Sequence, residues 1–325
     1  MNGCGGRGGV PPARRCLKTN IIPEPSQTRR AGRKEAETVL DGKVALVAGA
    51  IRGIGRAVAV ELARHGVRCV LPYYDWLDEL DDLHRAMRAA GPDYLALPAD
   101  LREEDEAARV VEAAVERFGR LDILVNNVER GGWPVVHGPY VPEQWDLEIR
   151  TTVTAKWALF RACLPHLKRR EGAAVVNLSS IAGLVGRAGP AGLVFNDGYA
   201  LANRAIRTLT ETWAREGAPE VRVNELMLGF VETRHGPGTR GWGLLAEADR
   251  EALLAHTLLG RTGRVEEVAR MVRFLVAEAT FVTGAVIRMD GGYLLGGEPA
   301  RPWPRGVVAP GEPTFGGGVR PGGKE

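Results

Sequence analysis

The chain has 325 residues, and 45% of them are hydrophobic, which is enough for the core of one large or two small domains. The net charge of +3 comes from the ends, because residues 1–40 carry +5, residues 296–325 carry +1 and the middle carries −3. The middle therefore shows no basic face for nucleic acid, and no apolar run approaches the ~18 residues of a membrane-spanning helix.

The cysteines show neither metal-ligand nor disulfide spacing, so we predict no metal site. They are Cys4, Cys16, Cys69 and Cys163. The N-terminus has arginines but lacks the apolar segment of a signal peptide, so we expect a cytoplasmic protein.

Both ends of the chain have the composition of disordered segments. Residues 1–40 are rich in Gly, Pro and Arg without periodicity, and nine Gly and six Pro fill half of residues 296–325. We therefore expect a basic disordered extension, a folded domain at 41–295 and a disordered Gly/Pro-rich tail. A transit peptide or a basic binding tail is the alternative for the N-terminal segment.

Strand and helix patterns alternate along the folded part. The predicted elements in chain order are strand 43–49, helix 55–66, strand 67–74, helix 76–91, strand 93–101, helix 103–119, strand 121–127, helix 142–170, strand 173–180, helix 198–217, strand 221–227, helix 265–279 and strand 284–292. Seven strands alternating with helices predict an α/β fold of the doubly wound Rossmann type. Its parallel sheet should be covered by helices on both faces.

The segment AGAIRGIG (48–55) joins the first strand to the first helix. Gly49, Gly53 and Gly55 permit a tight turn and a close approach of the backbone to a ligand. The helix starts at this turn beside Ile54, so its free N–H groups and the positive end of its dipole face a pyrophosphate. This context favours a dinucleotide-binding loop over a Gly-rich turn without a ligand.

Several landmarks follow one another in the order typical of the short-chain dehydrogenase/reductase family, which residues 41–295 resemble. They are the glycine spacing, "NN" at the end of the fourth strand, "SS" at the end of the fifth, a tyrosine on the next helix, "ADL" after the third strand and "RMDGG" near the end. The resemblance implies that Asp100 flanks an adenine, Asn126 holds the central sheet near the cofactor, and Thr233 meets the nicotinamide carboxamide. Two motifs depart from the family pattern: "NNVE" stands for "NNAG", and Leu228-Gly229 for Pro-Gly.

The cofactor-binding positions implied by the loop and the resemblance are Gly49, Arg52, Gly53, Ile54, Gly55, Tyr73, Asp75, Asp100, Leu101, Asn126, Tyr199, Asn203 and Thr233. Tyr73 stands where an acid usually takes the ribose hydroxyls of NAD, and Asp75 follows two residues later. Arg52 is placed as in relatives that prefer NADP, and an arginine fork suits a phosphate. We therefore expect NADP rather than NAD, with a solvated Arg52 as the alternative.

The resemblance also implies a catalytic set. In the family a tyrosine donates a proton to a carbonyl, a serine holds the substrate oxygen, a lysine binds the ribose and lowers the tyrosine pKa, and an asparagine supports a water chain. These positions are Tyr199, Ser180, Asn203 and Thr152 here, so two of the four match. Lys156, four residues after Thr152 on the same helix face, is a candidate replacement cation, with a solvated lysine as the alternative.

Ser180 and Tyr199 are nineteen residues apart, more than is common in the family, so we expect a larger loop between them.

These features predict a carbonyl reductase, acting on a small carbonyl or a 3-oxoacyl thioester. The alternatives are a cofactor-binding homologue that has lost catalysis and a protein with non-redox chemistry in an altered pocket. The resemblance implies a homodimer or homotetramer. Apolar residues on helices 142–169 and 198–217 favour the same conclusion, namely Trp157, Leu159, Phe160, Leu209 and Trp213.

Overall fold

The computed structural model describes residues 39–91, 93–129, 142–233, 242, 245–297 and 300–301. The two predicted extensions therefore lie almost wholly outside the described residues. Leu40, assigned above to the N-terminal extension, is fully buried in the core, so the folded part starts before residue 41. Among the described residues, no helix is both long and apolar enough to cross a membrane.

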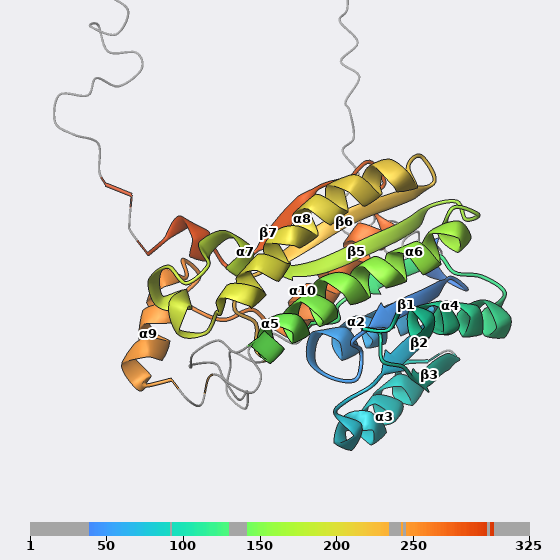
Figure 1. Cartoon of the computed structure of the whole chain (residues 1–325), viewed down its shortest axis with the longest axis horizontal. Coiled ribbons are helices and arrows are strands. Elements are labelled where there is room, and N and C mark those ends of the chain that lie inside the picture. Colours follow the sequence, from blue (N-terminus) through green and yellow to red (C-terminus); the bar gives the residue numbers. More distant parts are fainter. Residues whose placement is uncertain are drawn as a thin grey trace, which may run out of the picture.

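A seven-stranded parallel sheet forms the centre of the described chain, in the order β3-β2-β1-β4-β5-β6-β7 (Figure 1). The strands are β1 (Val44–Ala48), β2 (Arg68–Tyr73), β3 (Tyr94–Pro98), β4 (Ile123–Asn126), β5 (Ala173–Ser180), β6 (Val221–Leu228) and β7 (Val286–Met289). The order reverses between β1 and β4, which is where ligands bind in sheets of this kind. The predicted doubly wound fold is confirmed.

Helices cover both faces of this sheet. They are α2 (Gly53–Ala63), α3 (Leu80–Ala90), α4 (Glu104–Phe118), α5 (Pro142–Glu148), α6 (Ala155–Leu167), α7 (Ala182–Val185), α8 (Asp197–Gly217), α9 (Glu247–His256) and α10 (Val265–Ala277). One apolar core joins the sheet to α2, α3 and α10, and a second joins it to α4, α6 and α8. The short helix α7 and the helix α9 were not predicted. Both lie in the connections between the longer predicted strands and helices.

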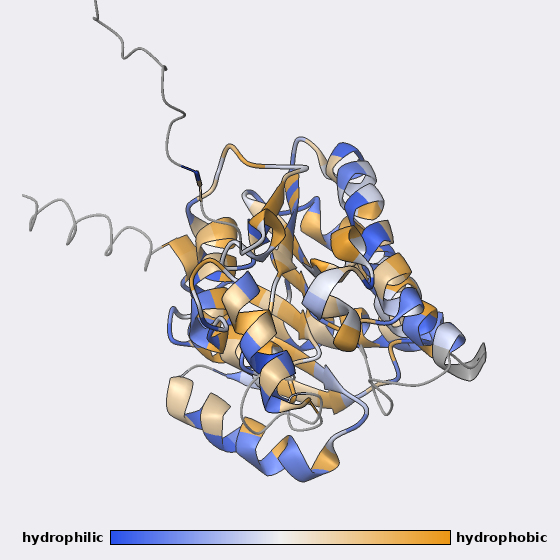
Figure 2. Ribbon diagram, turned by 90° about the vertical axis from the view of Figure 1, so that its left-hand side faces the viewer, coloured by the Kyte–Doolittle hydropathy of each residue, from blue (hydrophilic) through white to orange (hydrophobic). Residues whose placement is uncertain are grey.

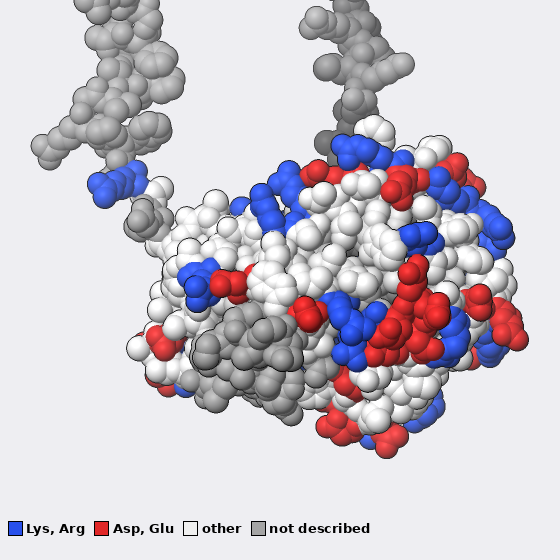
Figure 3. All heavy atoms as spheres, viewed as in Figure 1, with Lys and Arg blue, Asp and Glu red and all other residues white. Residues whose placement is uncertain are grey.

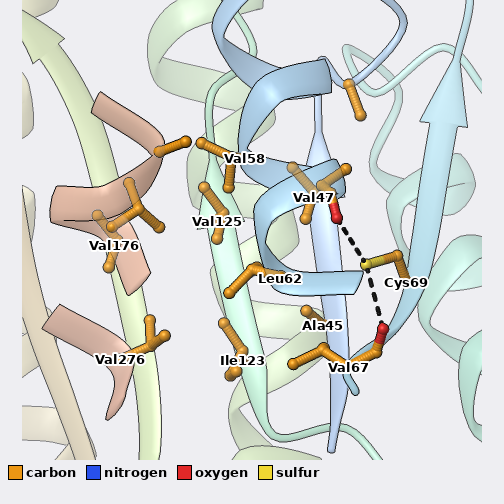
Figure 4. Close-up of a cluster of buried hydrophobic side chains, with 14 of the residues drawn as sticks. Ala45, Val47, Val58, Leu62, Val67, Cys69, Ile123, Val125, Val176 and Val276 are labelled. Atoms are coloured by element: carbon orange, nitrogen blue, oxygen red, sulfur yellow. Dashed lines mark hydrogen bonds between the residues drawn. The ribbon is translucent and has the colours of Figure 1, made fainter. Parts of the chain in front are cut away.

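The central strands are apolar on both sides because both sides are covered. In β1, Ala45 and Val47 belong to the first core while Val44 and Leu46 belong to the second, and all four are fully buried. Figure 4 shows the first core, in which side chains of α2 and α10 meet those of the sheet and the Cys69 thiol donates to the backbone. Figure 2 shows the same arrangement as hydrophobic strands in the middle and helices with hydrophilic outer residues.

The helix predicted over 142–170 is not continuous. α5 and α6 are joined by a π-helical segment at Ile149–Thr154, which ends one residue before α6 begins. A π-helical turn has one residue more than an α-helical turn, and such turns frequently lie at functional sites. Thr152 lies in this segment and is fully buried.

Three of the apolar residues that we assigned to an oligomer surface belong to the core of the chain itself. Leu159, Phe160 and Trp213 are buried, and the rings of Phe160 and Trp213 stack with centroids 4.4 Å apart. The long helices carry these residues because α6 and α8 pack on the sheet, so that part of the argument for an oligomer is wrong. The oligomeric state itself stays a prediction.

Charged side chains on the surface are largely distributed as pairs of opposite sign. Arg207 on α8 binds Glu211 one turn later, and Arg273 on α10 binds both Glu61 and Glu278. Figure 3 shows basic and acidic side chains interspersed on one face of the molecule.

Candidate active site

The predicted phosphate loop is a tight turn between β1 and α2. Gly49 and Gly53 have φ of +70° and +55°, which L side chains rarely adopt. A Cβ on Gly55 would lie 2.1 Å from the Gly49 carbonyl oxygen, so only glycine fits there. The Asn127 side chain, just after β4, donates to the same Gly49 oxygen at 3.1 Å and holds the loop against the end of β4.

The start of α2 is open to an anion. Arg52 precedes the helix in an extended conformation and gives no side-chain cap to the first N–H groups. Uncapped N–H groups at a helix N-terminus, approached through glycines, form a cradle that fits a pyrophosphate. Thr233 lies beside this cradle, because its Cγ2 would be 3.3 Å from a Cβ on Gly53. The structure thus brings Thr233 to the loop, and its contact with a nicotinamide carboxamide stays a prediction.

The turn after β2 places an aromatic ring against the loop. The Arg52 guanidinium lies over the Trp76 ring, 4.3 Å from its centroid. Trp76 itself has φ of +59°, an uncommon conformation for a residue with a large side chain. Tyr73, at the end of β2, and Asp75 are half-buried. Trp76 was not predicted from the sequence, although its place three residues after the end of β2 could have suggested it.

The carboxylate of Asp100 is engaged by its neighbour Arg102. Two guanidinium nitrogens of Arg102 donate to Asp100 at 2.7 and 2.5 Å. These hydrogen bonds hold the pKa of Asp100 below its ordinary value. Arg102 also lies over the Tyr74 ring. Leu101, which separates Asp100 from Arg102 in the sequence, is buried. Asp100 therefore lies two residues after the end of β3, paired with an arginine that was not predicted from the sequence, and its place beside an adenine stays a prediction.

A buried row of polar side chains connects the middle of the sheet to α8. The Asn126 amide donates to Asn177 Oδ1 at 2.9 Å, and Asn177 donates to Thr210 Oγ1 at 2.9 Å. Both asparagines and Thr210 are fully buried. Asn126 thus links β4 to β5, which agrees with the structural role that the resemblance implied.

Ser180 and Tyr199 stand at the same edge of the domain. Ser180 is the last residue of β5, and its Oγ accepts a hydrogen bond from the Ala182 N–H at 3.1 Å. Tyr199 lies in the first turn of α8, where its N–H donates to the Asn196 cap at 2.7 Å. The Tyr199 side chain belongs to the same apolar cluster as Ile181 and Ala182, the two residues after Ser180.

The segment between Ser180 and Tyr199 folds back as packed structure. After α7, a 3-10 turn at Gly189–Leu193 is attached to the C-terminal part of the chain, where the Ala191 N–H donates to the Tyr293 hydroxyl at 2.8 Å. Phe195 then lies between two rings, 5.7 Å from that of Tyr199 and 5.5 Å from that of Phe230. The expected larger loop is thus present, and it forms an aromatic wall beside Tyr199.

Asn203 and Thr152 are both fully buried. The Asn203 amide nitrogen donates to the Tyr199 carbonyl one turn earlier, at 3.0 Å, so this nitrogen is directed to its own helix. The Asn203 Oδ1 and the Thr152 Oγ1 have no hydrogen-bond partner among the described residues. Neither side chain carries a charge, so neither reproduces the lysine of the family pattern.

Lys156 does not lie in solvent. It is fully buried, and its Nζ donates to the Leu178 carbonyl at 2.6 Å. Burial lowers its pKa, and the negative charges of Glu129 and Glu225 oppose that effect. Glu225 on β6 is itself fully buried and accepts a hydrogen bond from the Ser179 hydroxyl. Glu225 was not predicted as a site residue, although a glutamate inside the apolar segment VRVNELM was a signal.

Known proteins match most of this chain. A family model described as Enoyl-(Acyl carrier protein) reductase matches residues 49–294. A protein named as a ketoacyl reductase of the granaticin polyketide synthase of Streptomyces violaceoruber is 39% identical over 255 residues, covering 78% of this chain and 96% of that protein. The 3-oxoacyl-(acyl-carrier-protein) reductase FabG of Thermotoga maritima is 32% identical over 260 residues, covering 79% and 99%. A solved short-chain dehydrogenase/reductase from Serratia marcescens is similar with a TM-score of 0.68 and 28% identity, covering 78% and 99%.

Proposed function

Because this chain belongs to the short-chain dehydrogenase/reductase family, an oxidoreductase family, we propose that it reduces a carbonyl group to an alcohol with a nicotinamide cofactor. In this proposal Tyr199 donates the proton and Ser180 holds the substrate oxygen. The observation that carries it is the packing of α7, the helix that begins two residues after Ser180, on α8. A Cβ on Gly183 in α7 would lie 2.7 Å from the Arg204 nitrogen, so the segment that follows Ser180 is in backbone contact with the helix that bears Tyr199.

The described residues fit the cofactor. The glycine cradle and the uncapped start of α2 suit a pyrophosphate, and Thr233 lies beside them. A bound nicotinamide cofactor would supply the hydride for the reduction. The protein's own part is to orient the carbonyl with Ser180, to protonate its oxygen from Tyr199, and to exclude water with the aromatic wall around Phe195.

The uncharged Asn203 favours reduction as the measurable direction. An ordinary tyrosine ionises near pH ~10, so at neutral pH it is a phenol, which is the form that donates a proton. Alcohol oxidation needs the phenolate, and a gap of about three pH units corresponds to about 4 kcal/mol at 1.36 kcal/mol per unit. Reduction and oxidation share one transition state, so the missing charge affects only which form of Tyr199, phenol or phenolate, is populated before the reaction.

For the substrate we propose a 3-oxoacyl thioester or a related ketone. Two of the relatives reported above are named as ketoacyl or 3-oxoacyl reductases. The rings of Phe195 and Phe230 give the neighbourhood of Tyr199 an apolar lining, which suits an acyl chain.

For the cofactor we propose a preference for NADP over NAD. Arg52 lies at the mouth of the phosphate cradle, held over the Trp76 ring, where its fork can bind a ribose phosphate. Arg52→Ala should weaken NADPH binding by about tenfold and leave NADH binding nearly unchanged. The matched control is Arg56→Ala, because Arg56 lies on the same helix and pairs with Glu79. Equal losses for both cofactors would contradict the preference.

The proposed activity is tested by NADPH consumption with a panel of 3-oxoacyl thioesters and aromatic and aliphatic ketones. Turnover that Tyr199→Phe reduces by at least about 100-fold, with NADPH binding retained, would support it. The second candidate function is a cofactor-binding protein without turnover, and the Asn203 amide directed to its own helix favours it. NADPH binding without turnover of any carbonyl, in the unmodified protein and in Tyr199→Phe alike, would establish that candidate instead.

We also propose that the protein is a homodimer or homotetramer. Family membership supports this proposal, whereas three of the apolar residues predicted for an oligomer surface, Leu159, Phe160 and Trp213, are buried in the core. Light scattering of the full chain measures the size, and a monomer at micromolar concentration would overturn this part of the proposal.

A further inference from the structure

Lys156 occupies a particular place at the end of the sheet. The ladder between β4 and β5 ends at the pair Asn126 and Asn177, so β4 no longer offers a partner to the next β5 carbonyl on that side. That carbonyl belongs to Leu178, and the Lys156 ammonium donates to it at 2.6 Å. A lysine from α6 therefore completes the hydrogen bonding of β5 two residues before Ser180.

Glu225 reaches the same strand from the other side. It is opposite Asn177 in the register of β5 and β6, and it accepts the hydroxyl hydrogen bond of Ser179. Lys156 thus holds the backbone of Leu178, and Glu225 holds the side chain of Ser179. These are the two residues that directly precede Ser180.

The two charges depend on each other. A bare ammonium or carboxylate in a protein interior is strongly disfavoured, and both side chains are fully buried. The charge of Glu225 favours the ammonium, and the charge of Lys156 favours the carboxylate. Glu129, which follows β4, is the stronger of the two negative charges that favour the Lys156 ammonium. Apolar side chains of similar volume are usually at least as stabilising as buried opposite charges, so the presence of both charges suggests a role other than stability.

We propose that Lys156, with Glu225 as its counter-charge, is a positioning residue of the catalytic end of β5. It supplies from α6 the buried positive charge that the uncharged position 203 lacks, and it acts on Ser180 and Tyr199 through the end of this strand. The inference rests on the proposed reductase function and names a residue of the same site.

The alternative is that the two side chains only stabilise the fold. Lys156→Met alone does not decide, because it leaves Glu225 buried without its counter-charge. The double variant Lys156→Met/Glu225→Gln removes both charges and keeps side chains of similar length. Its free energy of unfolding should fall less than that of Lys156→Met, by no more than the loss of the donor to the Leu178 carbonyl explains, while kcat falls by about tenfold or more with little change in KM.

Introducing a cation on α8 tests the inference more sharply than the double variant alone. In the double variant, Asn203→Lys should restore kcat by about tenfold, because the charge is again present at this end of the domain. In the unmodified protein the same substitution should lower both stability and kcat, since it adds a second ammonium to an interior that already holds Lys156. Lys168→Met, at the exposed end of α6, is the control lysine and should change neither quantity.

A measurement without cofactor or substrate separates this inference from the proposed function. Tyrosinate absorbance of each protein minus that of its Tyr199→Phe counterpart reports the ionisation of Tyr199 alone. We expect Tyr199 to ionise at higher pH in the double variant than in the unmodified protein. An unchanged ionisation together with full kcat in the folded double variant would overturn the inference and leave the reductase proposal intact. Absence of turnover in the unmodified protein would overturn the proposed function, and the tyrosine titration would still test Lys156.

Discussion

Gly183 packs against the backbone of α8 at Arg204, with room for no side chain between them. A Cβ on Gly183 would lie 2.7 Å from the Arg204 nitrogen and 3.0 Å from the Asn203 carbonyl carbon. Gly183 follows Ser180 by three residues, and Asn203 follows Tyr199 by one helical turn. This contact therefore limits how closely α7, which follows the strand bearing Ser180, can approach the helix bearing Tyr199.

Gly183→Ala should accordingly impair both stability and turnover. The clashing atoms belong to a backbone, so they can move away only if α7 and α8 separate, and overpacking of this kind costs about 1–3 kcal/mol. We expect a lower free energy of unfolding in urea and a kcat that falls more than NADPH binding does. Gly263→Ala is the control, because the nearest atom to its added Cβ would be 3.6 Å away, an ordinary contact. Equal kcat values for the two variants would contradict this account.

Gly55→Ala should act on the cofactor rather than on the chemistry. Its Cβ would lie 2.1 Å from the Gly49 oxygen and 2.6 Å from the Asn127 amide, so the turn must open. We expect the Kd for NADPH, measured by quenching of tryptophan fluorescence, to rise by about tenfold or more. Circular dichroism checks that the variant is folded. Unaltered NADPH affinity in the folded variant would mean that this loop does not hold the cofactor.

Tyr293→Phe should loosen the segment between Ser180 and Tyr199. The variant leaves the buried Ala191 N–H without its acceptor at 2.8 Å, and an unpaired buried donor costs about 1–3 kcal/mol. Hydrogen exchange should become faster over residues 187–196, and KM should rise because Phe195 packs beside Tyr199 at the proposed substrate site. Tyr94→Phe also removes a bonded hydroxyl, the partner of His84, and should leave this segment unchanged. Slow exchange at Ala191 in Tyr293→Phe would show that other contacts suffice.

The stability of Lys156→Met should depend on pH through Glu225. Burial raises the pKa of Glu225 above its ordinary value of 4.5. The hydrogen bond from Ser179 and then the charges of Lys156 and Arg207 oppose this rise in the unmodified protein, while Glu211 adds to it. Without Lys156 the folded state holds the proton more tightly than the unfolded state. The folded state then binds more protons between pH 4.5 and the raised pKa, so the free energy of unfolding falls as pH rises through that window.

Urea unfolding of Lys156→Met and of Lys156→Met/Glu225→Gln at about pH 5 and about pH 8 measures this effect. The first pH lies close to the ordinary pKa of 4.5, and the second lies well above it. Other carboxylates are the same in both variants, so the difference isolates Glu225. The single variant should lose stability relative to the double variant as pH rises. A difference that stays constant with pH would mean that Glu225 is equally ionised in both states.

Local sequence patterns determined much of this protein. The fold class could be predicted from short apolar runs, which are typical of buried strands, and from glycines at helix ends. The phosphate loop could be predicted from the spacing of Gly49, Gly53 and Gly55. Each of these signals depends only on residues close together in the chain. A glycine, for example, allows a tight turn whatever the tertiary structure around it. The ends of the seven predicted strands therefore agree with the structure within a few residues.

Tertiary structure alone decided the surroundings of the candidate site. Nothing near Lys156 in the sequence shows that its ammonium meets the Leu178 carbonyl, because that depends on where β4 stops pairing with β5. The same holds for Phe160 and Trp213, which read as surface residues along their helices and stack inside the core. A residue's type states which interactions it can make, but burial and counter-charges come from segments distant in the chain, and these decide which interactions it does make.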